Sequence, residues 1–322
     1  MALSFVTPTT PPDIVALGEA LIEFNQTRAS DPQAYLKGYG GDTSNAVIAA
    51  ARLDARAGYV TRVGDDPFGR ELLALWDHER VDTRGVATDP QAPTGVYFVS
   101  HGPRGHEFAY LRAGSAASRM SSATLPLDVI KGAKVLHVSG ISQAISEGAC
   151  DACFAAMAVA RDAGAKVSYD TNLRLKLWPL PRARAVIRAS VALSDWVVPS
   201  RDDATLLFER DDTDAIVDAC HALGAPLVAL KLGADGCVVS DGRRRERIAA
   251  CRVTSVDATG AGDCFAGAFA ARIIAGDDPF AAARYANAAA ALATTGFGAV
   301  SPLPRDPDVR ALMELEQSSA KA

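Results

Sequence analysis

The stretch DATGAGDCFAG, residues 257–267, places two aspartates on either side of a glycine turn. It then continues into an alanine-rich helix that we expect to span 260–276. The amides of Ala261, Gly262 and Asp263 would fall in the first turn of that helix, where backbone N–H groups have no intrahelical acceptor. Together with the positive end of the helix dipole, these amides predict an anion-binding site.

The carboxylate of Asp263 would stand at the edge of this anion site. Transfer of a phosphoryl group to an alcohol needs such an arrangement, because the amides stabilise the moving phosphate while the carboxylate accepts the hydroxyl proton. The helix dipole should lower the pKa of Asp263, but a loose transition state needs little early deprotonation, so an ionised acceptor is sufficient. The simpler interpretation is an aspartate that only caps its helix.

A second glycine turn occurs early, in YGGDTSNAVIAAARL at 39–53. Its paired glycines, the second of them Gly41, would let the backbone approach a ligand closely, and Asp42 or Thr43 would cap the following helix. Asp42 and Asn45 offer hydrogen-bonding edges suited to hydroxyl groups. Taken alone, a glycine turn followed by a cap is common and need not mark a binding site.

Length and composition exclude several classes of protein. The chain has 322 residues, a formal net charge of −5 and 49% hydrophobic residues. These values suit one large soluble domain and argue against a nucleic-acid-binding surface. No apolar run approaches the roughly 18 residues of a membrane helix, and the N-terminus lacks a signal-peptide pattern. We therefore expect a cytoplasmic protein with reduced cysteines, and we interpret Cys150 and Cys153 as buried in a helix.

Short β-branched runs alternate with helical patterns along most of the chain. This order predicts a doubly wound, mainly parallel α/β sheet flanked by helices. The expected strands are 13–18, 57–64, 134–140, 166–170, 195–200 and 226–233. The expected helices are 43–54, 67–79, 146–163, 181–192, 213–223 and 260–276.

Two regions, 20–40 and 94–118, interrupt this alternation with short strands that have no helix between them. We interpret them as a small antiparallel sheet that stands off the main sheet and forms a lid. The chain is thereby divided into a flexible leader (1–12), a single domain (13–310) and a C-terminal tail (311–322).

Other signatures of nucleotide binding and hydrolysis are missing from the sequence. It contains no GxxxxGK[ST], GxGxxG, HExxH or GxSxG pattern. Their absence disfavours a P-loop kinase, a dinucleotide dehydrogenase, a zinc protease and an α/β-hydrolase.

The two glycine stretches resemble the signatures of the ribokinase-like (PfkB) sugar kinases. GGDTSNA at 40–46 and DATGAGDCFAG at 257–267 occur in the family's order, and three further stretches extend the resemblance over nearly the whole chain. These are RVGDDPFG (62–69), KLGADG (231–236) and ANAAAALATTGFGAV (286–300). The resemblance implies one α/β domain, a β-sheet lid over the sugar, and ATP with Mg²⁺ as the phosphate donor. It leaves open whether a monovalent cation activates.

By that resemblance Asp263 is the catalytic base, and Gly260, Ala261 and Gly262 form the anion hole. The nucleotide side would be lined by Asn172, Ser200, Lys231, Gly233, Gly236 and Asn287.

One departure from the family pattern concerns the metal. The family often has Asn-x-x-Glu after the fifth core strand, and here Ser200 and Asp203 take those places. Asp203 is therefore expected to contact Mg²⁺ only weakly, through water.

Within the family, the chain most resembles the 2-keto-3-deoxygluconate kinases. The stretches that carry this resemblance are GEALIEF (18–24), GGDTSNA (40–46), YLRAGSAAS (110–118), SGIS (139–142) and DTNLRLKLW (170–178). By resemblance the sugar acid is contacted by Tyr110, Arg112 and Arg174, with Tyr97 on the partner lid strand. Gly41, Asp42 and Asn45 would complete the substrate site.

Charge supports this choice of substrate. An aldonic acid brings a carboxylate that an arginine can hold in bidentate fashion, whereas two arginines around a neutral sugar would be unfavourable. Three alternatives remain: Arg112 is a surface charge of the lid, Arg174 contacts phosphate, or the lid tyrosines only pack.

The main hypothesis is a kinase that phosphorylates the terminal hydroxyl of 2-keto-3-deoxy-D-gluconate with MgATP. The alternatives are a fructokinase or another neutral-sugar kinase, and a sugar-acid sensor without turnover. We expect no nucleic-acid or membrane partner. Because an exposed lid edge can pair with a second copy, we expect a homo-oligomer through the lid.

Overall fold

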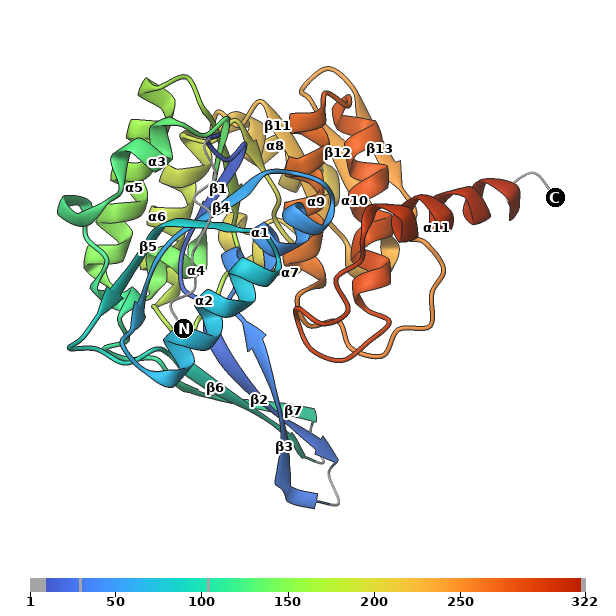
Figure 1. The fold of residues 1–322 in the computed structure, drawn as a ribbon. Coiled ribbons are helices and arrows are strands. Elements are labelled where there is room, and N and C mark those ends of the chain that lie inside the picture. Colours follow the sequence, from blue (N-terminus) through green and yellow to red (C-terminus); the bar gives the residue numbers. More distant parts are fainter. Residues whose placement is uncertain (1–9, 29–30, 103–104, 320–322) are drawn as a thin grey trace.

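The computed structural model describes residues 10–28, 31–102 and 105–319. Most of the predicted leader therefore lies outside the described residues. The main body is an α/β sandwich, from which a small second sheet projects (Figure 1).

Within the described residues, the main sheet has nine strands in the order β13-β12-β11-β10-β9-β8-β1-β4-β5. Neighbours from β11 to β5 are parallel, and β12 and β13 add an antiparallel edge. The strands are β1 (Ile14–Leu17), β4 (Ala57–Gly64), β5 (Asp82–Asp89), β8 (Val135–Ser139), β9 (Lys166–Asp170), β10 (Trp196–Val197), β11 (Leu227–Lys231), β12 (Cys237–Ser240) and β13 (Arg245–Ile248).

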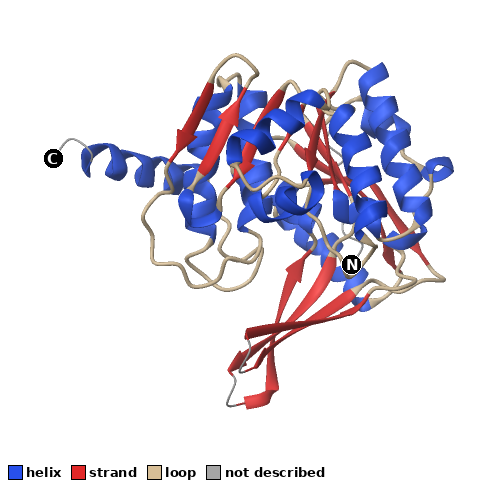
Figure 2. Cartoon of the chain, turned by 180° about the vertical axis from the view of Figure 1, so that it is seen from behind, coloured by secondary structure: helices blue, strands red, loops and turns tan. Residues whose placement is uncertain are grey.

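Helices cover both faces of this sheet (Figure 2). One face carries α1 (Asp42–Arg52), α2 (Pro67–His78), α9 (Ala261–Ala275), α10 (Pro279–Ala293) and α11 (Asp306–Ser319). The other carries α3 (Leu127–Lys131), α5 (Glu147–Asp162), α6 (Leu180–Ala192), α7 (Arg201–Phe208) and α8 (Thr213–Ala222). The short helices are η1 (Ala117–Arg119), η2 (Ser122–Thr124), α4 (Gly140–Ala144) and η3 (Gly233–Asp235).

The central strands are buried on both faces. In β1, Ile14 and Ala16 join one hydrophobic core while Val15 and Leu17 join the other. A strand that supplies two cores has no polar face, and this explains the continuous apolar runs in the sequence. The predicted doubly wound, mainly parallel sheet is confirmed.

Most predicted elements form close to their expected positions. All six expected helices end within two residues of the predicted bounds, and Cys150 and Cys153 are buried in α5 as expected. Among the described elements of eight residues or more, the prediction missed β5, α7, α10 and α11. Helix α10 was not predicted because most of its residues are buried, so its sequence shows no polar stripe at helical spacing. Helix α11 covers most of the region predicted as a tail.

The lid is a separate four-stranded sheet with the order β3-β2-β6-β7. Its strands are β2 (Leu21–Arg28), β3 (Asp31–Gly40), β6 (Val96–Gly102) and β7 (Gly105–Leu111). Each predicted segment forms an antiparallel hairpin, and the two hairpins join through the parallel pair of β2 and β6. The predicted lid is thus confirmed as a small sheet that stands off the body (Figure 1).

The two faces of the lid have different neighbours. On one face, Phe24 stacks on Phe98 at 5.1 Å between ring centroids and meets Phe68 of α2 at 6.0 Å, which attaches the lid to the body. On the other face, the rings of Tyr97 and Tyr110 stack at 5.6 Å. This second face carries the lid tyrosines singled out in the sequence.

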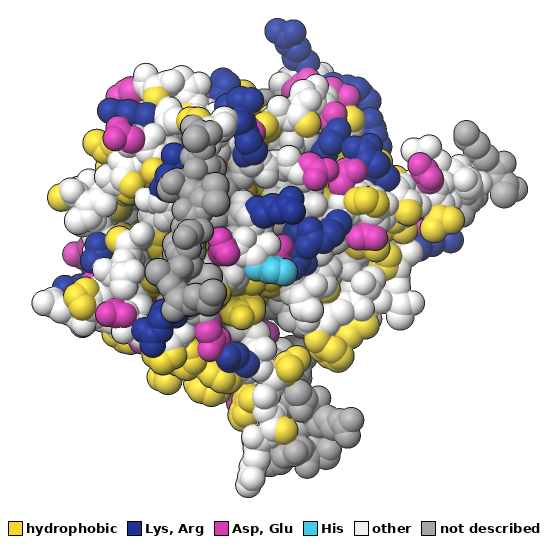
Figure 3. All heavy atoms as spheres, in the orientation of Figure 1, with side chains coloured by type: hydrophobic (Ala, Val, Ile, Leu, Met, Phe, Trp, Pro, Cys, Tyr) yellow, Lys and Arg dark blue, Asp and Glu magenta, His cyan; other side chains and the backbone are white. Residues whose placement is uncertain are grey.

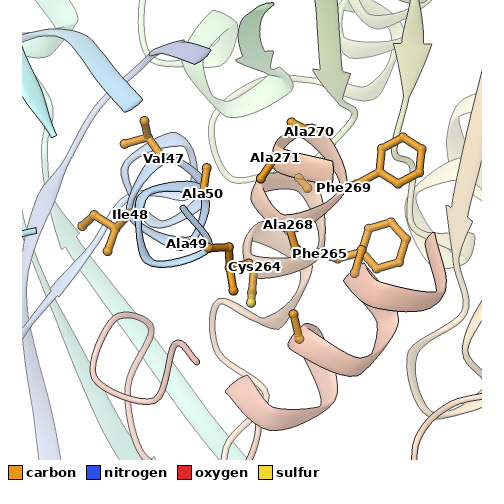
Figure 4. Close-up of a cluster of buried hydrophobic side chains, with 14 of the residues drawn as sticks. Val47, Ile48, Ala49, Ala50, Cys264, Phe265, Ala268, Phe269, Ala270 and Ala271 are labelled. Carbon is orange, nitrogen blue, oxygen red and sulfur yellow. The ribbon is translucent and has the colours of Figure 1, made fainter. Parts of the chain in front are cut away.

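Helices α1 and α9 pack directly against each other (Figure 4). Gly267 makes this possible, because a Cβ at that position would overlap the backbone oxygen of Ala46. Small residues on both helices let the backbones approach closely. The close packing brings the start of α1, which follows the first glycine turn, beside the start of α9.

We expect Gly267→Ala to destabilise the protein, although alanine is the better helix former by about 1 kcal/mol. The added methyl group must push α1 and α9 apart, and such overpacking lowers the free energy of unfolding by roughly 1–3 kcal/mol. Urea denaturation followed by circular dichroism measures the change. An unchanged or increased free energy of unfolding would contradict this account of the helix contact.

Candidate active site

The two glycine turns of the sequence meet in the structure. Asn45 near the start of α1 donates a hydrogen bond from Nδ2 to Oδ2 of Asp263 near the start of α9, at 2.8 Å. The two residues are 218 positions apart in the chain. The structure therefore brings the two predicted halves of the site into direct contact.

The anion site at α9 is smaller than the sequence predicts. Helix α9 begins after Gly260, whose φ of 77° suits glycine. The amide of Ala261 donates to the carbonyl oxygen of Ala258 at 3.2 Å, so it is not free as expected. Among the described residues, no backbone acceptor reaches the amides of Gly262 and Asp263. These two amides are therefore the ones that remain free for an anion.

The two aspartates of the opening stretch have different roles. Asp257 accepts hydrogen bonds from the amide and hydroxyl of Thr259, at 2.9 and 2.6 Å, and from the amide of Gly298 at 3.0 Å. It therefore holds the glycine turn in place. Asp263 accepts from Asn45 and does not cap its own helix, so the capping interpretation is wrong.

The environment of Asp263 raises its pKa to about 7. Burial is the largest cause, and the carboxylates of Asp42 and Asp170 add to it, while Asn45 and Lys231 oppose the rise. The expectation that the helix dipole lowers this pKa is wrong, because desolvation and like charges outweigh the dipole. A carboxyl group that titrates near neutral pH is well matched to accepting a proton.

Asn172 lies between two carboxylates. Its Nδ2 is 3.3 Å from Oδ2 of Asp42 and 3.5 Å from Oδ1 of Asp263. Its φ of 29° is unusual for a residue other than glycine. The sequence assigned Asn172 to the nucleotide side, whereas the structure places its side chain at the carboxyl group of Asp263.

The ammonium group of Lys231 lies next to the anion site. Its Nζ donates to Oδ2 of Asp170 at 2.6 Å, and a Cβ at Gly262 would lie 3.3 Å from the same Nζ. A lysine beside free amides can stabilise a phosphate as a point charge.

The other residues predicted on the nucleotide side hold local structure. Ser200 caps α7 by accepting from the amide of Asp203 at 3.2 Å, and Asn287 donates to the carbonyl oxygen of Ala249 at 2.7 Å. Gly233 and Gly236 bound the turn between β11 and β12.

The described residues do not form a complete metal site by themselves. They contain no cluster of three or more side chains able to hold a metal ion. Oδ2 of Asp203 accepts from the amide of Leu173 at 3.0 Å, and burial raises the pKa of this carboxyl group. Because Mg²⁺ commonly binds through substrate phosphates and waters, a nucleotide would bring most of its ligands.

The start of α1 leaves polar atoms without partners. The helix begins after Gly41, and neither Asp42 nor Thr43 caps it, so that expectation is wrong. Thr43 instead bonds to the hydroxyl of Tyr59 at 3.0 Å. Oδ1 of Asp42 and Oδ1 of Asn45 are buried without any hydrogen-bond partner. Such atoms in a native fold indicate a missing ligand or water.

The lid supplies Tyr97, Tyr110 and Arg112. The hydroxyl of Tyr97 donates to buried Glu23, and the guanidinium of Arg112 lies 5.8 Å from the ring centroid of Tyr110. Arg112 is only 11% exposed and forms an ion pair with Glu19. The interpretation of Arg112 as a surface charge of the lid is therefore wrong.

Two residues of the site escaped the sequence analysis. Glu19 and Glu23 both lie in GEALIEF and are both almost fully buried. A charged side chain within an otherwise apolar run could have marked them, because buried glutamates are rare unless paired. Arg174, in contrast, is exposed and donates to the carbonyl oxygen of Leu173 at 2.8 Å.

The geometry at α9 suits a phosphotransferase that acts on a hydroxyl group, since a base with a pKa near 7 adjoins two free amides and a lysine. Comparison of the sequence with known protein families identifies the class of phosphotransferase. The chain belongs to the pfkB family of carbohydrate kinases, whose family model matches residues 11–306.

Relatives in this family cover almost the whole chain. Fructokinase-1 of Oryza sativa subsp. japonica is 36% identical over 317 residues, which are 94% of this chain and 97% of the relative. The 2-dehydro-3-deoxygluconokinase of Thermoproteus tenax is 35% identical over 304 residues, 91% of this chain and 92% of the relative. Most of the similar relatives are fructokinases.

The fold also matches a solved structure, described as a ribokinase II from E. coli in complex with ATP and Mg²⁺. The TM-score is 0.88 at 26% identity, and the match covers 94% of this chain and 99% of the other. The predicted resemblance to ribokinase-like sugar kinases is confirmed.

We expect kcat/KM to rise with pH through a single ionisation near pH 7, because Asp263 can accept a proton only when ionised. Below that pH the carboxyl group is protonated and activity falls. A coupled assay of ADP release from pH 5.5 to 8.5, about 1.5 pH units on either side of the expected pKa, measures this rise of kcat/KM, the acidic limb of the pH profile.

Two variants serve as controls for this pH profile. Asp263→Asn should remove the limb and lower kcat by roughly 10²–10⁴-fold. Asp42→Asn removes a neighbouring charge and should shift the limb to lower pH. A profile that stays flat through neutral pH would show that Asp263 is not the base.

Proposed function

We propose that the chain transfers the γ-phosphoryl group of ATP to the terminal hydroxyl of 2-keto-3-deoxy-D-gluconate, giving 2-keto-3-deoxy-6-phosphogluconate. The observation that carries the choice of substrate is Arg112, a largely buried guanidinium under the lid whose Nε has no hydrogen-bond partner. A buried, incompletely bonded arginine is suited to a carboxylate. The relative from Thermoproteus tenax, named for this activity, supports the proposal.

In this proposal the hydroxyl oxygen of the sugar acid attacks the γ-phosphorus while the bond to the ADP oxygen breaks. The hydroxyl proton passes to Asp263. The amides of Gly262 and Asp263 and the ammonium of Lys231 stabilise the charge on the transferring group. Asp42 and Asn45, which have unpartnered oxygens, accept hydrogen bonds from the sugar hydroxyls.

The nucleotide would lie on the side of α9 that faces Lys231. Ser200, Gly233, Gly236 and Asn287 shape the loops there, and Asp203 would contact Mg²⁺ through water. Arg174 is exposed beside this region, within electrostatic range of Asp203. Its guanidinium is therefore available to a phosphate or to the sugar acid.

A second candidate substrate is fructose. Glu19 balances the charge of Arg112, so the pocket is less positive than two converging arginines suggested from the sequence. A pocket without net positive charge can accept a neutral sugar, and fructokinases predominate among the relatives. A sensor without turnover is less well supported, because binding alone does not need a base with a pKa near 7.

We also propose that the enzyme works in the cytoplasm without nucleic-acid or membrane partners. All six cysteines are free. No helix in the described part of the chain has the length and apolar character to span a bilayer. On the face shown in Figure 3, basic and acidic side chains are intermixed. Arg244, Arg245 and Arg284 form ion pairs with acidic residues. Such a surface offers no extended positive area to nucleic acid.

The proposal predicts that kcat/KM for 2-keto-3-deoxygluconate exceeds that for fructose and ribose. Arg112→Ala should raise KM for the acid by roughly 10–100-fold and that for a neutral sugar by much less, because only the acid loses a charged partner. Coupled kinetics on the substrate panel measure both effects. Faster turnover of fructose than of the acid would reject this substrate while leaving the kinase activity intact.

We propose further that the chain forms a homo-oligomer through the lid, since β3 and β7 are open edges and Leu36 on β3 is 58% exposed. Leu36→Glu should reduce the mass measured by sedimentation equilibrium from a dimer or larger assembly to a monomer. Leu206→Glu, at an exposed leucine on α7, is the matched control and should have no effect. A monomeric wild type would disprove the assembly.

A further inference from the structure

Glu19 occupies the space between β1 and the base of the lid. It is only 1% exposed, its Oε1 accepts a hydrogen bond from the hydroxyl of Ser115, and it pairs with the guanidinium of Arg112. A Cβ at Gly95 would lie 2.9 Å from the same Oε1, so the backbone of the lid closes directly over the carboxylate. Glu19 is therefore held in one position and shielded from solvent.

The pair of Glu19 and Arg112 is close but incompletely bonded. Oε2 of Glu19 and Nε of Arg112 are both buried, and neither makes a hydrogen bond of acceptable geometry. A guanidinium has five N–H donors, so the contact with Glu19 leaves capacity for a second acceptor. Arg112 therefore has donors left for a ligand carboxylate while Glu19 stays beside it.

The charges around Arg112 oppose that approach. Glu19 and Asp42 interact electrostatically with each other and with Arg112. Tyr59, whose pKa burial raises, also interacts with both carboxylates, and Asp170 interacts with Asp42. With both carboxylates ionised, one cation faces two anions before any ligand arrives. A carboxylate on the ligand would add a third negative charge in a buried site, which is unfavourable.

We infer that Glu19 is the specificity-determining residue of this pocket: it balances Arg112, and an anionic sugar can bind Arg112 only when Glu19 takes up a proton. The proton comes from solvent on binding and returns to solvent on release, so no other group changes. A neutral sugar needs no such uptake. This inference rests on the proposed function for the identity of the natural ligand. The requirement that an anionic ligand be accompanied by a proton on Glu19, and a neutral ligand not, holds whichever candidate is the true substrate.

The chemistry of Glu19 agrees with proton uptake. Burial raises the pKa of this carboxyl group, and Arg112 and the Ser115 hydroxyl offset part of the rise. When a ligand carboxylate engages Arg112, that offset weakens and the protonated form of Glu19 becomes more favourable. Glu19 then stays in place through Ser115 as a neutral hydrogen-bonding group.

The direct test is calorimetry of binding to the whole chain without ATP, in two buffers of different ionisation enthalpy. The wild type should take up about one more proton per site with 2-keto-3-deoxygluconate than with fructose. Glu19→Gln should abolish that difference and tighten binding of the acid by roughly 10–100-fold, because it removes one nearby negative charge. Equal uptake for acid and fructose in the wild type would overturn the inference, and this measurement needs no variant.

Kinetics supply a second readout with a matched control. Glu19→Gln should raise the ratio of kcat/KM for acid over fructose at least about tenfold. Ser115→Ala keeps the carboxyl group and removes only one hydrogen bond that favours its ionised form, so it should raise the ratio by no more than about threefold. Thermal melting checks that both variants fold. An unchanged ratio in folded Glu19→Gln would overturn the inference.

These outcomes separate the inference from the proposed function. If fructose is the better substrate of the wild type, the proposed function fails, yet the ratio should still rise in Glu19→Gln. If the acid is the better substrate and the ratio does not move, the function stands and the role of Glu19 fails.

Discussion

The site depends on the close contact between helices α1 and α9. Gly267 lets the backbones approach until Asn45 can donate to Asp263 at 2.8 Å. This contact places the two glycine turns, the proposed sugar and phosphate sites, on one side of the sheet, although they are far apart in the chain. A separation of the two helices by the width of one methyl group would remove both the hydrogen bond and the shared site.

Once the helices are joined, carboxyl groups crowd together. Asp42, Asp170 and Asp263 lie near one another, with Lys231 and Asn172 as their main partners. Burial and mutual repulsion raise the pKa of Asp263 to about 7, which a lone aspartate at a helix start would not reach. At the base of the lid, Glu19 is likewise a buried carboxyl group whose pKa is raised by burial, a rise that is partly offset by a neighbouring cation, Arg112. In both places the charge of a buried group depends on a few neighbouring charges.

Sequence reasoning succeeded where the physics is local. The alternation of apolar runs and helical patterns predicted the bounds of six helices to within two residues. Strand burial and helix periodicity both depend on the types of residues that are close together in the sequence. Sequence reasoning missed α10, because most residues of that helix are buried and the sequence shows no alternation of polar and apolar faces. It also gave the wrong direction for the pKa of Asp263, because that pKa depends on Asp42 and Asp170, which are far away in the chain. It also missed Glu19, because nothing adjacent in sequence reveals its partner Arg112.

The sequence by itself determined the class of fold, the second sheet, the two glycine turns and the aspartate beside free amides. The turns and the aspartate each follow from one short segment, and the fold class and the second sheet follow from local patterns repeated along the chain. Only the tertiary structure decided which carboxyl groups share a site, which amide of the turn is already bonded, and which charge faces Arg112. Electrostatic free energies depend on distance and burial in three dimensions, so segments far apart in the chain set them together.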